Sequence, residues 1–273
     1  MPATNTYNDQ LGREVSIAYP PRRIISLVPS QTELLYDLGL DEEVIGITKF
    51  CIHPEAWFRH KTRIGGTKQL HLEEILALQP DLVIANKEEN TAEQVQFLMQ
   101  HVPVWVSDIQ CLEDALDMIR SIGNITGKIE RAAEIAGNID LSFRQLATTL
   151  QARPPLHTAY FIWREPWMVA GGDTFIHTML AYCRLENVFA GTARYPTIDL
   201  DQLKSNCQLI LLSSEPYPFK EKHIRELQDV LPGVRIELVD GEMFSWYGSR
   251  LEKAAVYLHE FRQKLEELPH RVS

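Results

Sequence analysis

"LHLEEILALQPDLVIANKEE", residues 70–89, places a short amphipathic run before a proline and then an uninterrupted apolar run. Residues 197–216, "TIDLDQLKSNCQLILLSSEP", repeat that order. The first run aligns at an offset of 128 and the second at 127, which pairs Leu72, Glu73, Ile75 and Leu82 with Leu200, Asp201, Leu203 and Leu209. A short helix followed by a buried strand in both halves predicts two similar α/β units.

Strand-like and helix-like stretches alternate on both sides of this repeat. Strands are expected at 23–28, 44–49, 157–163 and 167–172, and a helix-then-strand order at 71–86 and 92–108. In the helix after residue 28, Ser30 and Glu33 have the spacing of a capping box and Gly39 is a stop signal. Such alternation predicts mainly parallel sheets with helices on their faces.

Residues 127–151 form a different pattern, without proline and with apolar residues at three- and four-residue steps. The stripe consists of Ile129, Ala132, Ala133, Ala136, Ile139, Phe143, Leu146 and Leu150. It predicts one stiff helix of about 23 residues, roughly 35 Å long. The expected division is therefore an N-terminal lobe at 1–126, a connecting helix at 127–152 and a C-terminal lobe at 153–273.

The composition excludes several classes of protein. The 273 residues carry a formal net charge of −10 with scattered Lys and Arg, which argues against nucleic-acid binding. No apolar stretch approaches the ~18 to 20 residues of a membrane span. Four separated cysteines contain no CxxC pair, and Cys111, Cys183 and Cys207 are expected in the core. Residues 1–15 lack the pattern of a secretory signal, which favours a cytoplasmic protein or a trimmed chain.

Ligands of open α/β sheets bind where the parallel strands end. The segments after the predicted strands include "KFCIHP", "NKEEN", "WREPW" and "GEMFSWYGSR". We therefore expect a shared cleft whose wall includes Trp163, Arg164, Trp167, Trp246, Tyr247 and Arg250. Aromatic side chains with charged neighbours are typical of a solvent-accessible cleft wall. Arg250 could bind an acidic group of a ligand. Core packing of the rings and a solvent-facing arginine are the alternatives.

Cys51 and His53 lie two positions apart in the first of these segments. They could be metal ligands, completed by His71, Glu88 or Glu89, or a nucleophile and its base, or ordinary loop residues. Because no second closely spaced pair exists, a closed structural metal site is not expected. We expect both side chains to contact a bound ligand or its metal.

The whole pattern resembles the helical-backbone (class III) substrate-binding proteins of bacterial ABC importers for vitamin B12, ferric siderophores or haem, with the vitamin B12 binders nearest. The motifs that carry the resemblance are "GREVSI" at 12–17, "PPRRIISLVPSQTELLYDLG" at 20–39, "LEEILALQPDLVIA" at 72–85, "WREPWMVAGGDTFIHTML" at 163–180, "ENVFAG" at 186–191 and "GSRLEKAAVYL" at 248–258. The resemblance implies two lobes, a long rigid helix and a bulky ligand held between aromatic walls.

Carried over by position, the resemblance implies ligand contact at Phe50, Trp167 and Tyr195. Two further places, at which the vitamin B12 binders have tryptophan, fall on Thr67 and Asn86. In members of the family, one acidic residue on each lobe docks to arginines of the membrane permease. By resemblance, these positions correspond to Glu73 and Asp201.

The expected function is that of a solute-binding protein, not an enzyme. It would hold a corrinoid, ferric siderophore or haem for an ABC importer, as a monomer that needs no cofactor and does not span the membrane. The resemblance implies an extracytoplasmic location. The alternatives are a cytoplasmic sensor or scavenger of such a ligand, and a small enzyme that uses Cys51 and His53.

Overall fold

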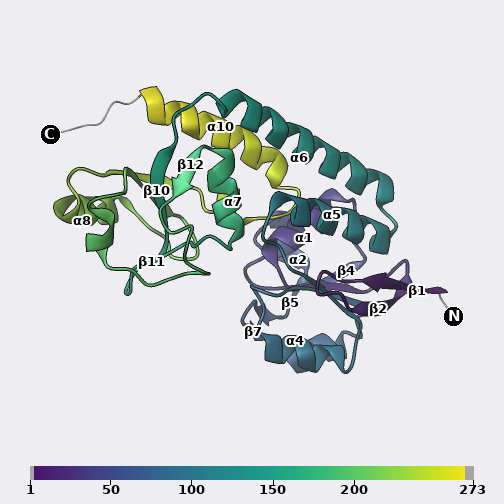
Figure 1. Ribbon diagram of the computed structural model, residues 1–273. Coiled ribbons are helices and arrows are strands. Elements are labelled where there is room, and N and C mark those ends of the chain that lie inside the picture. The colour runs from purple at the N-terminus through teal and green to yellow at the C-terminus, as the bar shows by residue number, and fades with distance from the viewer. Residues whose placement is uncertain (1–2, 268–273) are drawn as a thin grey trace. The chain divides into compact units, whose positions relative to one another are not determined.

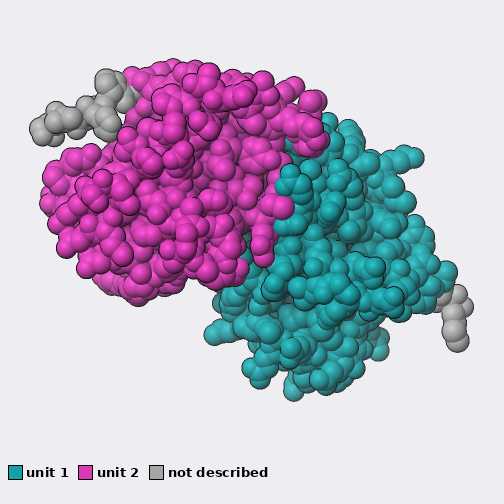
Figure 2. Space-filling model, viewed as in Figure 1, with its two compact units in different colours: residues 1–109, 113–139, 247–250 teal, residues 110–112, 140–246, 251–273 magenta. Residues whose placement is uncertain are grey.

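Two sheets of mainly parallel strands organise the chain, in a computed structural model that describes residues 3–267 (Figure 1). Each sheet belongs to one of two compact units (Figure 2). The first unit contains the chain up to residue 109 together with 113–139 and 247–250, and the second contains 110–112, 140–246 and the chain from 251. The prediction of two α/β lobes is confirmed, whereas the limits 1–126 and 153–273 stay a proposal.

The sheet of the first unit has five parallel strands in the order β5-β4-β3-β8-β9. Its strands are β3 (Ile24–Ser26), β4 (Val44–Ile47), β5 (Thr62–Arg63), β8 (Leu82–Asn86) and β9 (Val104–Ser107). Every residue of β3, β8 and β9 is buried, which explains why these strands are continuous apolar runs in the sequence.

Helices connect these strands in the order expected for parallel pairing. The connecting helices are α1 (Pro29–Asp37), α2 (Glu55–His60), α3 (Leu72–Ala77) and α4 (Ala92–Met99), and α5 (Leu112–Thr126) follows the last strand. Two antiparallel hairpins complete the unit: β1 (Ala3–Asn8) with β2 (Glu14–Tyr19), and β6 (Gly65–Gly66) with β7 (Gln69–Leu70). Gly39 ends α1 with φ at 78°, a conformation that glycine adopts without strain.

The sheet of the second unit has the order β11-β10-β13-β14, with β12 also paired to β10. Only the β10–β11 pair is antiparallel. The strands are β10 (Leu156–Trp163), β11 (Met168–Val169), β12 (Leu185–Asn187), β13 (Leu209–Ser213) and β14 (Arg235–Val239). The helices are α7 (Phe175–Tyr182), the 3-10 turn η1 (Leu200–Leu203), α8 (Glu221–Val230), α9 (Glu242–Ser245) and α10 (Leu251–Glu267).

The long helix predicted at 127–151 is α6 (Ile129–Leu150), drawn in teal in Figure 1. Its first half belongs to the first unit and its second half to the second. The predicted stripe is buried from Ala132 to Leu150 except at Ala133, and Ile129 is 56% exposed because it lies at the first position of the helix. Within residues 3–267, no helix is both long and apolar enough to cross a lipid bilayer.

Two local predictions are wrong. Helix α1 begins at Pro29, with Val28 in the capping position, so Ser30 and Glu33 do not form a capping box. The carboxylate of Glu33 instead pairs with Arg250. The counterpart of α3 in the second unit is only the four-residue turn η1, which Asp199 caps by accepting a hydrogen bond from the backbone of Asp201.

Candidate ligand-binding site

In each unit, the edge at which the parallel strands end is called here the carboxyl edge. In the first unit, β8 runs directly into the turn 86–90 at this edge. The Asn86 side chain accepts hydrogen bonds from the backbone of Glu88 and Glu89 and donates one to Ser107 Oγ at 3.0 Å. Asn90 Oδ1 accepts from the backbone of Asn86 at 2.9 Å. Asn86 is buried and shapes the turn, so this position presents no exposed side chain.

Phe50 supplies the exposed ring of this edge, with 51% of its surface accessible. The ring lies against Gly66 of the β6–β7 hairpin, where an added Cβ would stand 3.1 Å from Phe50 Cε2. The ammonium group of Lys49 lies 5.2 Å from the ring centroid. A glycine at this place lets the aromatic side chain lie on the hairpin without a steric clash, while about half of its surface stays accessible.

The structure places Cys51 in the core, which corrects the expectation that it contacts a ligand. Its side chain is fully buried, and its Sγ lies 3.1 Å from the hydroxyls of both Thr32 and Thr48. Burial raises the pKa of the Cys51 thiol to about 11. A protonated, inaccessible thiol serves neither as a nucleophile nor as a metal ligand.

His53 is half-buried in the loop before α2, and its contact with a ligand stays a prediction. His71, expected as one further metal ligand, lies 3.0 Å from Glu74 on α3. Within residues 3–267, no three His, Cys, Asp or Glu side chains are grouped closely enough to hold a metal ion.

Residues 247–250, here called the strap, are part of the first unit although they follow α9 of the second. Tyr247 is 6% exposed, and its hydroxyl donates to Glu89 Oε1 at 3.1 Å. Burial, followed by the charge of Glu89, raises the pKa of Tyr247 well above its ordinary value. Arg250 is 7% exposed and donates two hydrogen bonds to Glu33. The expectation that Arg250 holds an acidic ligand group is therefore corrected: its charge is already matched.

The carboxyl edge of the second unit carries a cluster of rings, here called the aromatic cluster, formed by Trp163, Trp167, Tyr217, Phe219 and His223. Trp163 ends β10 and is 41% exposed, and it meets Tyr217 edge to face with ring centroids 5.7 Å apart. Trp167 is stacked parallel to Phe219 at 6.2 Å. Tyr217 and Phe219 follow the end of β13, so two adjacent strand ends build the cluster.

Arg164 fixes the turn that carries Trp167. Its guanidinium donates to Glu226 at 2.8 Å, also pairs with Glu165, and lies 5.6 Å from the Trp167 ring. The hydrogen bond to Glu226 raises the pKa of Arg164. Because both acids belong to the protein, Arg164 holds the cluster in place and is not an unmatched charge for a ligand.

Tyr195 and Trp246 take different places in the second unit. Tyr195 is half-buried in the loop after β12, and the Arg194 guanidinium lies 5.8 Å from its ring. Trp246 is 7% exposed and donates from Nε1 to Glu215 Oε1 at 2.9 Å. Burial raises the pKa of Glu215, and Ser245 donates a second bond to the same oxygen. The Trp246 side chain is therefore buried, and its hydrogen bond holds the Glu215 carboxyl group in place.

The sequence reasoning missed Tyr217, Phe219 and His223. The signal was present, because "EPYPFKEKH" at 215–223 follows the end of a buried strand, as the other candidate segments do. Glu73 and Asp201, expected to dock a permease, are exposed in the first turns of α3 and η1, and Asp201 lies 2.6 Å from Lys204 Nζ.

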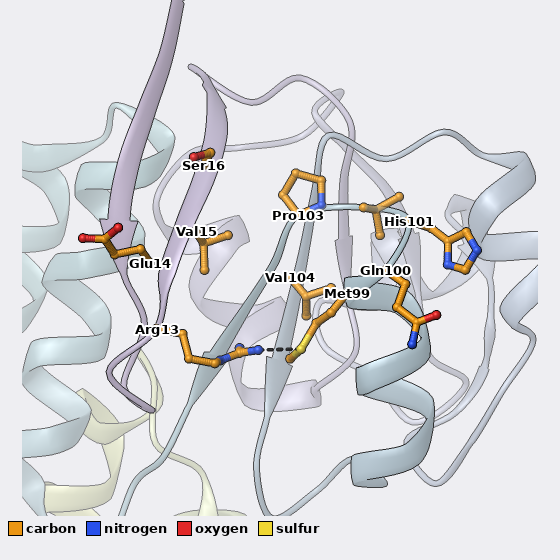
Figure 3. Close-up of a pocket in the computed structure, with 10 residues that line it drawn as sticks. Arg13, Glu14, Val15, Ser16, Met99, Gln100, His101, Pro103 and Val104 are labelled. Atoms are coloured by element: carbon orange, nitrogen blue, oxygen red, sulfur yellow. Dashed lines mark hydrogen bonds between the residues drawn. The ribbon is translucent and has the colours of Figure 1, made fainter.

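A pocket of about 470 Å³ in the first unit contains none of the expected ligand-binding residues. Figure 3 shows it beside β2 and β9, with Arg13 reaching the sulfur of Met99. Its wall consists of residues 13–16 and 99–104. The two side-chain surfaces at the carboxyl edges thus remain the better candidates for binding a ligand.

Comparison with known proteins identifies the family of this chain. A family model described as "Periplasmic binding protein" matches residues 24–229. The vitamin B12-binding protein of Vibrio parahaemolyticus is 28% identical over 222 residues, 79% of each chain, and that of Vibrio campbellii is 27% identical over 197 residues, 71% of each chain.

Solved structures share the fold at lower identity. The periplasmic vitamin B12 binding protein of Vibrio cholerae has a TM-score of 0.78 at 19% identity, and the match covers 91% of this chain and 99% of that one. A periplasmic heme-binding protein from Roseiflexus has a TM-score of 0.75 at 21% identity, over 89% and 98%. Since the family model spans most of the described residues, the chain belongs to the periplasmic binding protein family.

Proposed function

We propose that this protein reversibly binds a bulky metal complex of the corrinoid, ferric siderophore or haem type and delivers it to an ABC importer, without bond chemistry. The aromatic cluster is the observation that carries the proposal. It presents partly exposed rings at the strand ends, where ligands of α/β proteins bind. The names of the relatives, which bind vitamin B12 or heme, support the choice of ligand class.

The rings suit a large, flat ligand. Trp163 and Tyr217 are held edge to face, and Trp167 is stacked on Phe219 and flanked by Arg164, so little side-chain freedom is left to lose on binding. The exposed face of Phe50 offers a similar contact on the first unit. A corrinoid is the first candidate, because the two relatives at 27–28% identity are vitamin B12-binding proteins.

The enzyme alternative has lost its main support. It required a reactive Cys51 thiolate, and the burial and raised pKa of this thiol oppose that form. A half-buried His53 without an accessible partner thiol is not sufficient for nucleophilic catalysis. Reversible binding needs none of these groups.

The importer role rests on Glu73 and Asp201 as docking acids. Each lies in the first helical turn before a buried strand of its own unit, β8 for Glu73 and β13 for Asp201. Exposed acids in equivalent places of two similar units suit a partner with two basic sites.

The test is a titration of the purified protein with cyanocobalamin, hemin and a ferric hydroxamate, followed by visible absorption. Saturable binding of one of them with a Kd in the micromolar range or below supports the proposal. Trp167→Ala should weaken that binding, whereas Phe97→Ala, which removes an exposed ring from α4, should not. Failure to bind any of the three complexes contradicts the proposal.

A further inference from the structure

His223 and Tyr217 form a hydrogen-bonded pair within the aromatic cluster, and the pair has a defined direction. The backbone N–H of Lys220 donates to His223 Nδ1 at 2.9 Å. A ring nitrogen that accepts a hydrogen bond carries no proton, so Nδ1 is the unprotonated nitrogen of this imidazole.

A neutral imidazole then has its hydrogen on Nε2. This nitrogen lies 3.3 Å from the hydroxyl of Tyr217, so the N–H donates to the phenol oxygen. Burial, together with the charges of Lys222, Arg164 and Lys220, lowers the pKa of His223, and Glu226 opposes this effect. The neutral form, on which the direction of the bond depends, is therefore favoured by the surroundings.

The Tyr217 hydroxyl still has its own hydrogen to donate. In the described part of the chain, His223 is the one hydrogen-bond partner of this hydroxyl. Tyr217 is half-buried whereas His223 is 2% exposed, so the tyrosine lies on the accessible side of the pair. Its backbone N–H reaches Ile162 O at 3.4 Å, which ties the residue to the end of β10 beside Trp163.

We propose that Tyr217 is a specificity-determining residue, fixed by His223 as a donor toward a carbonyl-type oxygen on the rim of the bound metal complex. The inference rests on the proposed function and narrows its ligand class to complexes that carry amide or carboxylate groups. His223 is a positioning residue, because it acts through Tyr217. A hydroxyl that donates a hydrogen bond contacts an oxygen on the organic rim of a ligand and not its metal ion.

The first experiment needs no ligand. Nitrogen-15 NMR at pH 7.5 should show His223 with a protonated Nε2 and an unprotonated Nδ1. The opposite tautomer would overturn the inference whatever the protein binds, and it would leave the proposed function untouched.

The second experiment measures Kd for cyanocobalamin, hemin and an iron porphyrin whose propionates are replaced by ethyl groups. Tyr217→Phe should weaken binding of the accepted ligand about 3- to 10-fold, the effect of one neutral hydrogen bond. Tyr36→Phe, at an exposed tyrosine of α1, is the control and should change nothing. An effect with cyanocobalamin identifies amide oxygens, and an effect with hemin that vanishes for the ethyl porphyrin identifies carboxylates.

Variants of His223 separate positioning from simple structural support. His223→Asn keeps an acceptor for the Lys220 N–H but cannot reach Tyr217, so it should weaken binding as Tyr217→Phe does, and the double variant should add little. His223→Gln places an amide N–H where Nε2 lies and should restore most of the affinity.

Two results would overturn the inference while the proposed function stands. The first is that Trp167→Ala loses binding of a ligand whereas Tyr217→Phe binds the same ligand with wild-type affinity. The other is a phenolate-to-metal absorption band that disappears in Tyr217→Phe.

Discussion

The guanidinium of Arg250 holds the carboxylate of Glu33 through two hydrogen bonds, Nε to Oε2 at 2.7 Å and Nη2 to Oε1 at 2.8 Å. The two residues are 217 positions apart in the sequence, and neither side chain is more than 9% exposed. The pair fixes the strap 247–250 to α1 inside the first unit.

Removing one partner of this pair should destabilise the protein strongly. Arg250→Met leaves the Glu33 carboxylate buried without its cation, which costs about 3–5 kcal/mol of unfolding free energy. Urea unfolding followed by circular dichroism measures the loss. Arg120→Met, which breaks an exposed pair with Asp117, is the matched control and should stay within about 0.5 kcal/mol of the wild type.

A second variant checks the cause of that loss. Replacing both residues, with Glu33→Leu in addition to Arg250→Met, removes the unpaired charge and should recover much of the stability. Equal destabilisation by the single and double changes would show that packing, and not the stranded charge, was responsible.

Phe50→Ala should weaken ligand binding while leaving the fold intact. The ring is 51% exposed, so its loss removes little buried area, but loss of one aromatic contact with a ligand costs about 1–3 kcal/mol of binding free energy. The absorption titration gives the Kd and thermal unfolding gives the stability. Equal affinity of Phe50→Ala and the wild type would exclude Phe50 from the site.

Cys51 should resist thiol reagents in the folded protein. Its side chain is fully buried and its pKa is raised to about 11, whereas Cys111 is half-buried and should be labelled first. Mass spectrometry after brief treatment with iodoacetamide at pH 7.5 distinguishes the two. Cys51→Ser should leave the spectrum of a bound ligand unchanged, and a clear spectral shift would return Cys51 to the site.

Acid should destabilise the aromatic cluster through His223. Its pKa in the folded protein lies below the ordinary value of 6.5, so between these two values the unfolded chain binds a proton that the folded chain does not. The stability linked to neutral His223 is therefore complete above about pH 6.5 and is lost as the pH falls toward the folded-state pKa. Melting curves from pH 8 to pH 5 should show a drop in the wild type that is smaller in His223→Asn. The same drop in both proteins would assign the acid sensitivity to other groups.

Reversal of the two docking acids should stop transport without harming binding. Glu73→Lys combined with Asp201→Lys places two cations against a basic partner, which prevents productive encounter. Uptake in cells that carry the importer should fall to background, with an unchanged Kd for the ligand. Glu93→Lys combined with Glu221→Lys alters first-turn acids of α4 and α8 and should transport normally.

Much of the architecture could be predicted from the sequence, because the signals for it are local. Apolar periodicity located the strands around Leu82 and Leu209, and apolar residues at three- and four-residue steps without a proline located the core of α6. Boundaries and caps were less accurate. The spacing of Ser30 and Glu33 fitted a capping box. In the structure the helix begins earlier, at Pro29, and Glu33 pairs with Arg250 instead.

The candidate site followed a similar division. The rule that ligand residues follow the strands selected Trp163 and Trp167, and the family resemblance selected Phe50. Phe50 and Trp163 are exposed and Trp167 is half-buried, and their contact with a ligand stays a prediction. The same rule assigned Cys51 and Arg250 to ligand contact, but both side chains are buried.

The sequence by itself determined the order of elements, the two repeated α/β units and the long helix, because hydrophobic periodicity and helix-breaking residues act over a few neighbouring positions. Only the tertiary structure decided which polar groups are matched internally. The thiol of Cys51 lies between two threonines, Arg250 is bound to Glu33, and His223 orients Tyr217. Each outcome depends on burial and on partners brought together by packing, and a polar side chain loses water only where such a partner replaces it.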